Sequence, residues 1–262
     1  MGYRGRDVEV TFRDGLCLVA ACDSCGAVGE KELDAVQVPA YVTGRFTARV
    51  ALFEVLATGA EPQIVTAAIC NEPDPTGEKI LKGVRDELNL SAPGPLPMAI
   101  SCEKNMPTKQ TGLGISVVGL GEAEHLRIAL TRPGDDVYCL GIPKVGPEVH
   151  SPDDPDIVQA GHIRRLLALP AVHDIIPVGS QGILGEIHTL ETALRLRFVA
   201  ANEQVHPASG GVRPLGTPDL HKSGGPSTCV VFSAEPGVLE DLKLKESRHG
   251  PVPMFRLGTF QA

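Results

Sequence analysis

Residues 41–62 read YVTGRFTARVALFEVLATGAEP and carry more structural information than any other part of the chain. Within them, apolar residues recur at intervals of three or four: Phe46, Val50, Phe53 and Ala57. This period is typical of an amphipathic helix, which we expect over residues 43–58. Gly59 follows at a position where a helix end favours a left-handed residue.

One acidic residue, Glu54, falls on the apolar side of this expected helix. A carboxylate is costly to bury, so it must be neutral, bind a cation or accept hydrogen bonds. A salt bridge to Arg45 or Arg49 would also satisfy it. The helical period does not distinguish these possibilities.

The first half of the chain alternates strand and helix signals around this segment. Residues 8–12 and 16–21 read as a hairpin with a turn at 13–15, and three further strands are expected at 64–69, 98–102 and 113–120. Pro75 and Thr76 open a second helix with Ile80, Val84 and Leu88 on one face. We expect an N-terminal domain over residues 1–122.

The second half, residues 123–262, repeats the mixture and predicts a C-terminal α/β domain, so the fold class is α+β. Strands are expected at 126–130, 137–140, 172–176, 229–232 and 252–257, and helices at 154–169 and 182–196. Residues 132–135 form a turn, and Pro236 opens a short acidic helix. Residues 202–225 lack periodicity and are expected to form a long loop.

Composition excludes several classes of function. The 262 residues are 42% apolar, with a formal net charge of −8 and seven cysteines at irregular spacing. An acidic chain is a poor nonspecific nucleic-acid binder, since such binding depends on many basic contacts to phosphate. There is no apolar run of membrane-spanning length and no secretory signal pattern, so we expect a cytoplasmic protein with reduced thiols.

Three acidic positions suggest phosphoryl chemistry. Asp23 ends an apolar strand, Glu54 lies on the helix, and Glu103-Lys104-Asn105 follows another strand. Carboxylate oxygens that converge on one point can hold Mg²⁺ against the phosphates of a nucleotide. The alternatives are a turn at Asp23 and a solvated loop at 103–105.

Two other patterns are weaker. Gly179, Ser180 and Gly182 precede a helix whose N-terminus would attract anions. Cys22 and Cys25 form a C-x-x-C with no second pair to complete a zinc site. The G-x-S-x-G, P-loop and G-x-G-x-x-G motifs are missing from the sequence.

In this order, these residues resemble the PurM-like superfamily of aminoimidazole ribonucleotide synthetase, thiamin-monophosphate kinase, selenophosphate synthetase and a hydrogenase maturation protein. The most specific match is at residues 52–62, which are similar to that superfamily's Ser-Asp-(apolar)-Ala-Ala-Met-Gly-Ala-x-Pro helix. The other matches are Asp7 to an acidic pair, Asp23 to Thr-Asp, residues 103–105 to Gly-Gly-Asp-Thr, residues 132–135 to Arg-x-Gly-Asp, residues 180–183 to Ser-Asp-Gly-Leu, and residues 224–227 to Gly-Gly-Glu-Asp.

The resemblance implies an ATP- and Mg²⁺-dependent kinase that phosphorylates a hydroxyl of a nucleoside-like small molecule. It implies a homodimer in which two N-terminal sheets pair into a barrel, with nucleotide at their interface. Gln181 and Pro226-Ser227 replace acids of thiamin-monophosphate kinase, so a different substrate is expected. The best match is the α-ribazole kinase branch of cobalamin salvage; a thiamin-monophosphate-kinase-like enzyme, a related ligase and an inactive nucleotide-binding protein are the alternatives.

In the expected mechanism, Asp23, Glu54 and Glu103 bind metal and Asp7 joins them around the nucleotide. Glu54 is also the essential catalytic position, while Lys104 and Asn105 orient the transferred group. Gly179, Ser180 and Gly182 contribute from the second half.

Overall fold

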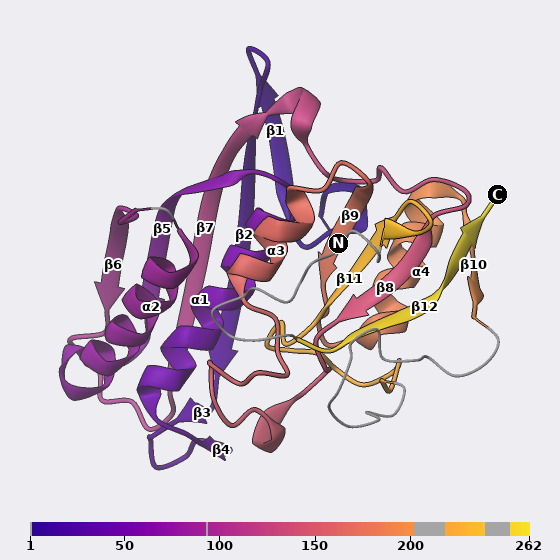
Figure 1. The fold of residues 1–262 in the computed structure, drawn as a ribbon. Helices are drawn as coiled ribbons and strands as arrows, with labels where there is room; N and C mark the ends of the chain where they lie inside the picture. The colour runs from indigo at the N-terminus through magenta and orange to yellow at the C-terminus, as the bar shows by residue number, and fades with distance from the viewer. Residues whose placement is uncertain (1, 93, 202–217, 239–251) are drawn as a thin grey trace.

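Two five-stranded sheets form the framework of the protein, one from each half of the chain (Figure 1). The computed structural model describes residues 2–92, 94–201, 218–238 and 252–262. The first sheet has the order β1-β2-β7-β5-β6, in which only β5 and β6 pair in parallel. It consists of β1 (Glu9–Arg13), β2 (Leu16–Gly26), β5 (Glu61–Ile69), β6 (Met98–Cys102) and β7 (Gly112–Glu122). All five strands were predicted, and β2, β5 and β7 extend beyond the expected residues.

Helix α1 (Ala40–Ala57) packs on β2 and β7, and α2 (Glu78–Ser91) packs against α1 (Figure 1). Gly59 has a φ of 84°, as its place after the helix predicts. The expectation of an amphipathic α1 is wrong, because α1 is buried on nearly every side, its only half-exposed residues being Tyr41, Val42 and Val50. It lies between the first sheet and the second half of the chain, where α3 and β9 also contact it. Its charged side chains must therefore find partners inside the protein.

Glycines bring α1 and α2 into close contact. A Cβ at Gly83 would lie 2.1 Å from the carbonyl oxygen of Tyr41, and one at Gly44 would lie 2.2 Å from that of Ile80. Only a residue without a side chain fits at either position.

Gly83→Ala is expected to lower the free energy of unfolding by about 1–3 kcal/mol, because the two helix backbones would have to separate. Gly161→Ala in α3 is the matched control. Its Cβ meets no atom within 4 Å, and alanine favours a helix over glycine by roughly 0.5–1 kcal/mol. Urea unfolding of the two variants measures the difference; equal stabilities would contradict the close contact.

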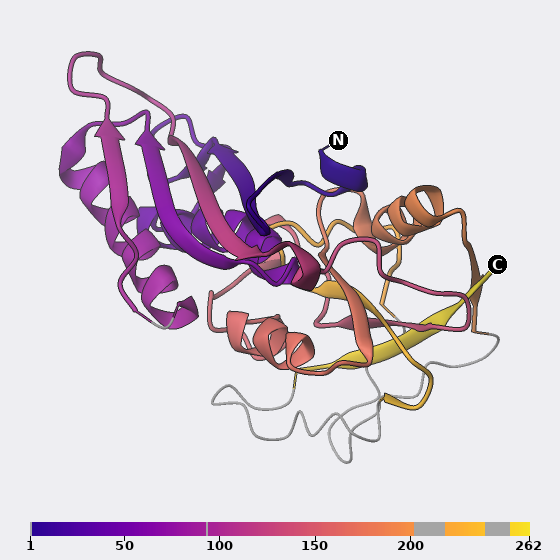
Figure 2. The ribbon, with the colours of Figure 1, turned by 90° about the horizontal axis from the view of Figure 1, so that it is seen from above.

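The second sheet is antiparallel, with the order β10-β12-β8-β11-β9. Its strands are β8 (Asp136–Leu140), β9 (Val172–Pro177), β10 (Arg197–Ala200), β11 (Val230–Ala234) and β12 (Met254–Gln261). Figure 2 shows α3 (Ala160–Leu167) and α4 (Gly182–Leu194) on opposite sides of it. Tyr138 and Leu140 of β8 belong to the core that contains α1 and α3, while Val137 and Cys139 pack with α4. This alternation buries both faces of the sheet.

Several expectations for the second half are wrong. Residues 126–130 are not a strand, because the buried carboxylate of Asp174 accepts the backbone N–H groups of Ala129, Leu130 and Thr131. The helix expected over 154–169 begins only at Ala160. Strand β10 was not predicted; α4 ends early at Arg195, whose φ of 58° turns the chain into it.

The remaining expectations are partly testable. The turn at 132–135 is present, with the Asp135 carboxylate accepting the Arg132 N–H at 2.7 Å. The acidic helix from Pro236 and the loop at 202–225 lie largely outside the described residues. Within the described ranges, no helix combines the length and apolar character needed to cross a bilayer.

Among the described residues, the face of the first sheet opposite α1 remains exposed. On it, Leu18 of β2 is 43% exposed and Ile64 of β5 is 48% exposed. The register places Leu18 opposite Leu120 and Ile64 opposite Val118, so the apolar residues form a continuous stripe. The five strands do not close into a barrel within one chain.

Candidate active site

Glu54 is buried where the two halves of the chain meet. Its side chain is 10% exposed, and its Oε2 atom has no hydrogen-bond partner. The nearest cation is Arg6, whose Nη2 lies 3.9 Å from that oxygen. Arg6 lies there because β1 and β2 are antiparallel and pair Glu9 with Ala20. The residues before Glu9 therefore continue alongside β2 toward Asp23.

Burial and neighbouring acids raise the proton affinity of Glu54. Burial raises the pKa of Glu54 to about 8; the Arg6 charge opposes this, whereas Asp7, Glu186 and Asp23 add to it. Burial also raises the pKa of Asp23 to about 6, although a hydrogen bond from the Ser24 backbone N–H partly lowers it. This region can therefore accept a cation or hold protons near neutral pH.

Asp23 reaches this region because of the alternation along β2. It follows Cys17, Val19 and Ala21 on the face that α1 covers. The turn considered for Asp23 is not formed, since β2 continues to Gly26. Asp23 and Glu54 therefore lie near each other, as expected.

Helix α4 supplies the opposite wall of the site. A cavity of about 800 Å³ lies between α4 and the N-terminal segment, and Asp7, Gly179, Ser180 and Glu186 line it. Glu186 accepts a hydrogen bond from the Gly179 N–H at 3.2 Å. Burial raises the pKa of Glu186, while the Gly179 N–H and the Arg6 charge oppose that rise.

Gly182 does not line this cavity. A Cβ at Gly182 would lie 2.8 Å from backbone atoms of His221 and Lys222, and its φ is 71°. Glycine is required there for a close backbone approach and a left-handed conformation. The structure thus brings together Asp7, Gly179 and Ser180, but not Gly182.

Glu103, Lys104 and Asn105 lie elsewhere. They follow β6, at the opposite edge of the sheet from β1 (Figure 1). At the usual strand spacing, β6 is roughly 14 Å from β2, which excludes a shared metal ion within one chain. The Glu103 Oε1 atom accepts the N–H groups of Asn105 and Met106, and these hydrogen bonds lower its pKa.

The predicted convergence of Asp23, Glu54 and Glu103 in one chain is therefore wrong. Across the part of the chain that the structure describes, no three His, Cys, Asp or Glu side chains could together hold a metal ion. Strand order is the cause, because β5 and β7 separate β6 from β2.

The loop after β6 borders a different and more open hollow, of about 610 Å³. Two buried polar side chains hold its walls. Asn71 donates to the Thr108 hydroxyl and the Gln110 carbonyl, both at 2.7 Å. Asp34 accepts the Thr111 N–H and hydroxyl, also at 2.7 Å. These groups satisfy one another and stabilise the loop.

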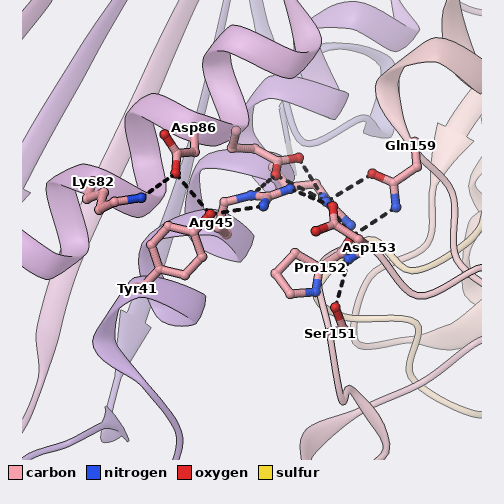
Figure 3. Close-up of polar contacts among 10 residues, drawn as sticks. Tyr41, Arg45, Lys82, Asp86, Ser151, Pro152, Asp153 and Gln159 are labelled. Atoms are coloured by element: carbon pink, nitrogen blue, oxygen red, sulfur yellow. Dashed lines mark hydrogen bonds and ion pairs between the residues drawn. The ribbon is translucent and has the colours of Figure 1, made fainter. Parts of the chain in front are cut away.

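The salt bridge considered between Glu54 and Arg45 or Arg49 is also absent. Both arginines bind Glu87 of α2, with nitrogen–oxygen distances of 2.6 Å for Arg45 and 2.7 Å for Arg49 (Figure 3). Glu54 is therefore left with Arg6 as its nearest cation.

Cys22 and Cys25 do not form a pair. Both are free thiols, and three residues apart on β2 they point to opposite faces of the sheet. Cys25 lies on the α1 side and Cys22 is exposed. A redox or zinc function for this C-x-x-C is not supported.

Sequence reasoning missed Arg6 and Glu186. Arg6 directly precedes Asp7 in the sequence, and an arginine next to a proposed acidic position was a usable signal. Glu186 lies between Ile183 and Ile187, two buried residues of α4. An acid within that apolar pattern, as at Glu54, could have been noticed.

Comparison with known proteins gives a fold but no close relative. No protein-family model and no curated sequence matches the chain. The HypE–HypF complex aligns with a TM-score of 0.67 and 17% identity over 98% of this chain and 87% of that chain. Thiamine-monophosphate kinase from Stenotrophomonas maltophilia K279a aligns with a TM-score of 0.61 and 16% identity, covering 97% and 89%. AaThiL complexed with AMPPCP and TMP gives a TM-score of 0.61 and 13% identity, covering 98% and 85%.

The chain has the PurM-like fold. The fold predicted from residues 52–62 is thereby confirmed. In this PurM-like chain, Asp23 and Glu54 come from the first half and the Gly179–Ser180 wall from the second, so the candidate site needs both halves.

Proposed function

We propose that the protein is an ATP-dependent kinase that phosphorylates a hydroxyl of a nucleoside-like small molecule, with α-ribazole as the first substrate to test. The observation that carries this proposal is a group of four acids beside a large cavity: the buried Glu54, the half-buried Asp23 and Glu186, and the exposed Asp7. Thiamine-monophosphate kinases share the fold, and AaThiL is complexed with AMPPCP. We further propose that the enzyme works in the cytoplasm.

The residues present fit magnesium bound together with a nucleotide. Mg²⁺ keeps several waters and usually takes only one or two carboxylates plus phosphate oxygens, so Asp23 and Glu54 suffice. The unpartnered Oε2 of Glu54 is available for this role. Magnesium would neutralise charge on the phosphates. Glu103, Lys104 and Asn105 would act only if a second subunit brought them near.

The acceptor would enter the cavity beside α4. Asp7, Ser180 and Gln181 line it with groups that accept or donate hydrogen bonds to hydroxyls. Gln181 is exposed there, and an amide in place of an acid suits an uncharged substrate better than a second metal ion.

ADP release is the direct test. Purified protein is incubated with Mg²⁺-ATP and a panel of acceptors that contains nucleosides, among them α-ribazole, and also thiamin monophosphate. We expect ADP and a phosphorylated product with one nucleoside, and none with Asp23→Asn. ATP binding without turnover of any acceptor would favour the inactive nucleotide-binding alternative, for which Gln181 and Ser227 are the motivating residues. An amidine product would favour the ligase.

We also propose a homodimer formed through the exposed face of the first sheet. Leu18→Asp places a charge in its apolar stripe and is expected to convert a dimer into a monomer, because a buried unpaired charge is strongly unfavourable. Leu90→Asp is the control, since Leu90 is 60% exposed on α2. Light scattering after gel filtration measures the mass; a monomeric wild-type protein would contradict the proposal.

A further inference from the structure

Arg6 is a buried cation with no hydrogen-bond acceptor. Its side chain is 2% exposed, and Nε, Nη1 and Nη2 are all without a partner. Arg49 is equally buried, yet it donates to Glu87, to the Pro152 carbonyl and to Gln159. Leaving a buried guanidinium unsatisfied costs several kcal/mol, so such a group calls for a ligand.

The neighbouring carboxylates do not supply the missing acceptor. The Nη2 atom of Arg6 comes no closer than 3.9 Å to Glu54, which is beyond hydrogen-bond length. Glu186 directs Oε1 at the Gly179 N–H instead. Arg6 thus lies among acids without being bonded to any of them.

Arg6 itself does not line the cavity. Its neighbours in the chain, Arg4, Gly5 and Asp7, line it together with Gly179 and Ser180, while the Arg6 side chain is buried next to this wall. At the start of the 13-residue helix α4, the Gly182 and Leu184 N–H groups already donate to the carbonyls of Gly179 and Leu220. The guanidinium of Arg6 is therefore the group here that favours an anion.

The chemistry of this region selects the kind of anion. A bare anion would be repelled by Asp7, Asp23, Glu54 and Glu186, so the ligand must bring a cation with it. A nucleotide phosphate that carries magnesium meets this condition. Two oxygens of a tetrahedral phosphate also match the fork of a guanidinium, which can form two parallel hydrogen bonds.

We propose that Arg6 binds the terminal phosphate of the nucleotide through its guanidinium, next to Glu54 of α1. This inference rests on the proposed function. It makes Arg6 the residue that distinguishes a nucleoside triphosphate from the diphosphate left after transfer.

Calorimetry on the full chain tests this with AMPPCP and ADP, each with Mg²⁺. Arg6→Gln is expected to weaken AMPPCP binding by about 10- to 100-fold, the loss of a charge-assisted hydrogen bond or two, and to leave ADP affinity unchanged. Arg6→Lys keeps the positive charge but lacks the forked guanidinium, so its affinity for AMPPCP should lie between those of the wild type and Arg6→Gln. Arg13→Gln, at an arginine that is 88% exposed at the end of β1 and outside the cavity, should not change the ratio of the two affinities.

Several outcomes would overturn the proposal. One is that the wild-type protein binds AMPPCP no more tightly than ADP. Another is that Arg6→Gln lowers the affinities for AMPPCP and ADP by the same factor. A variant with a lower melting temperature but an unchanged affinity ratio would make Arg6 purely structural. If Arg6→Gln does not fold, the ratio in Arg6→Lys decides. If Arg6→Gln changes the ratio of AMPPCP to ADP affinity but the wild type phosphorylates no acceptor, the role of Arg6 is supported and the proposed kinase activity is rejected.

Discussion

Glu54→Gln is expected to make the metal-free protein more stable than wild type at pH 8 while abolishing phosphoryl transfer. The pKa of Glu54 is about 8 in the folded protein, against 4.5 as its ordinary value. Between these values the folded state holds a proton that the unfolded state has released. Stability therefore falls as pH rises through this window, by up to ~4 kcal/mol if the full shift applies. Glutamine does not titrate, so the variant lacks this loss.

Urea unfolding at pH 5 and pH 8 in magnesium-free buffer measures the effect. The difference in stability between wild type and Glu54→Gln should be small at pH 5 and several kcal/mol at pH 8. Glu124→Gln is a suitable control, because the Glu124 side chain is 82% exposed and its removal should leave the profile unchanged. Parallel profiles for wild type and Glu54→Gln would mean that Glu54 is solvated, and full activity in the variant would remove it from the mechanism.

Glu87→Ala is expected to be among the most destabilising single changes, at about 3–5 kcal/mol, a large share of a typical domain's stability. Glu87 is 1% exposed and binds two guanidiniums that are themselves buried. Removing it leaves Arg45 and Arg49 as buried charges without their main partner. Arg49 also donates to the Pro152 carbonyl at 2.8 Å, so the link from α1 to the second half should weaken as well.

Asp153→Asn is the matched control for Glu87. Asp153 also binds Arg45, at 3.1 Å, but its side chain is 54% exposed. An exposed ion pair contributes at most about 1 kcal/mol, so this variant should remain close to wild type. Thermal and urea unfolding of both variants give the comparison. A Glu87→Ala protein as stable as Asp153→Asn would show that solvent reaches the arginines.

Local patterns in the sequence determined much of the framework. The apolar run at residues 16–21 predicted a strand with Asp23 just after it, whereas the packing of α1 decided which face of β2 is buried. Spacing of three and four identified α1, and Gly59 marked its end. Such features depend on neighbours a few residues away, so they can be predicted from the chain alone. The proximity of Asp23 and Glu54 follows from them once α1 packs on the sheet.

Tertiary structure alone decided which distant residues meet. Strand order put β6 at the sheet edge and took Glu103 away from Asp23. Tertiary packing also brings Arg45 and Arg49 to Glu87, and Arg6 to Glu54. The Asp174 carboxylate binds the backbone of residues 129–131, which therefore do not form a strand. These pairs are separated by about 40 residues or more along the chain. Their meeting depends on how whole elements pack, which no local period encodes.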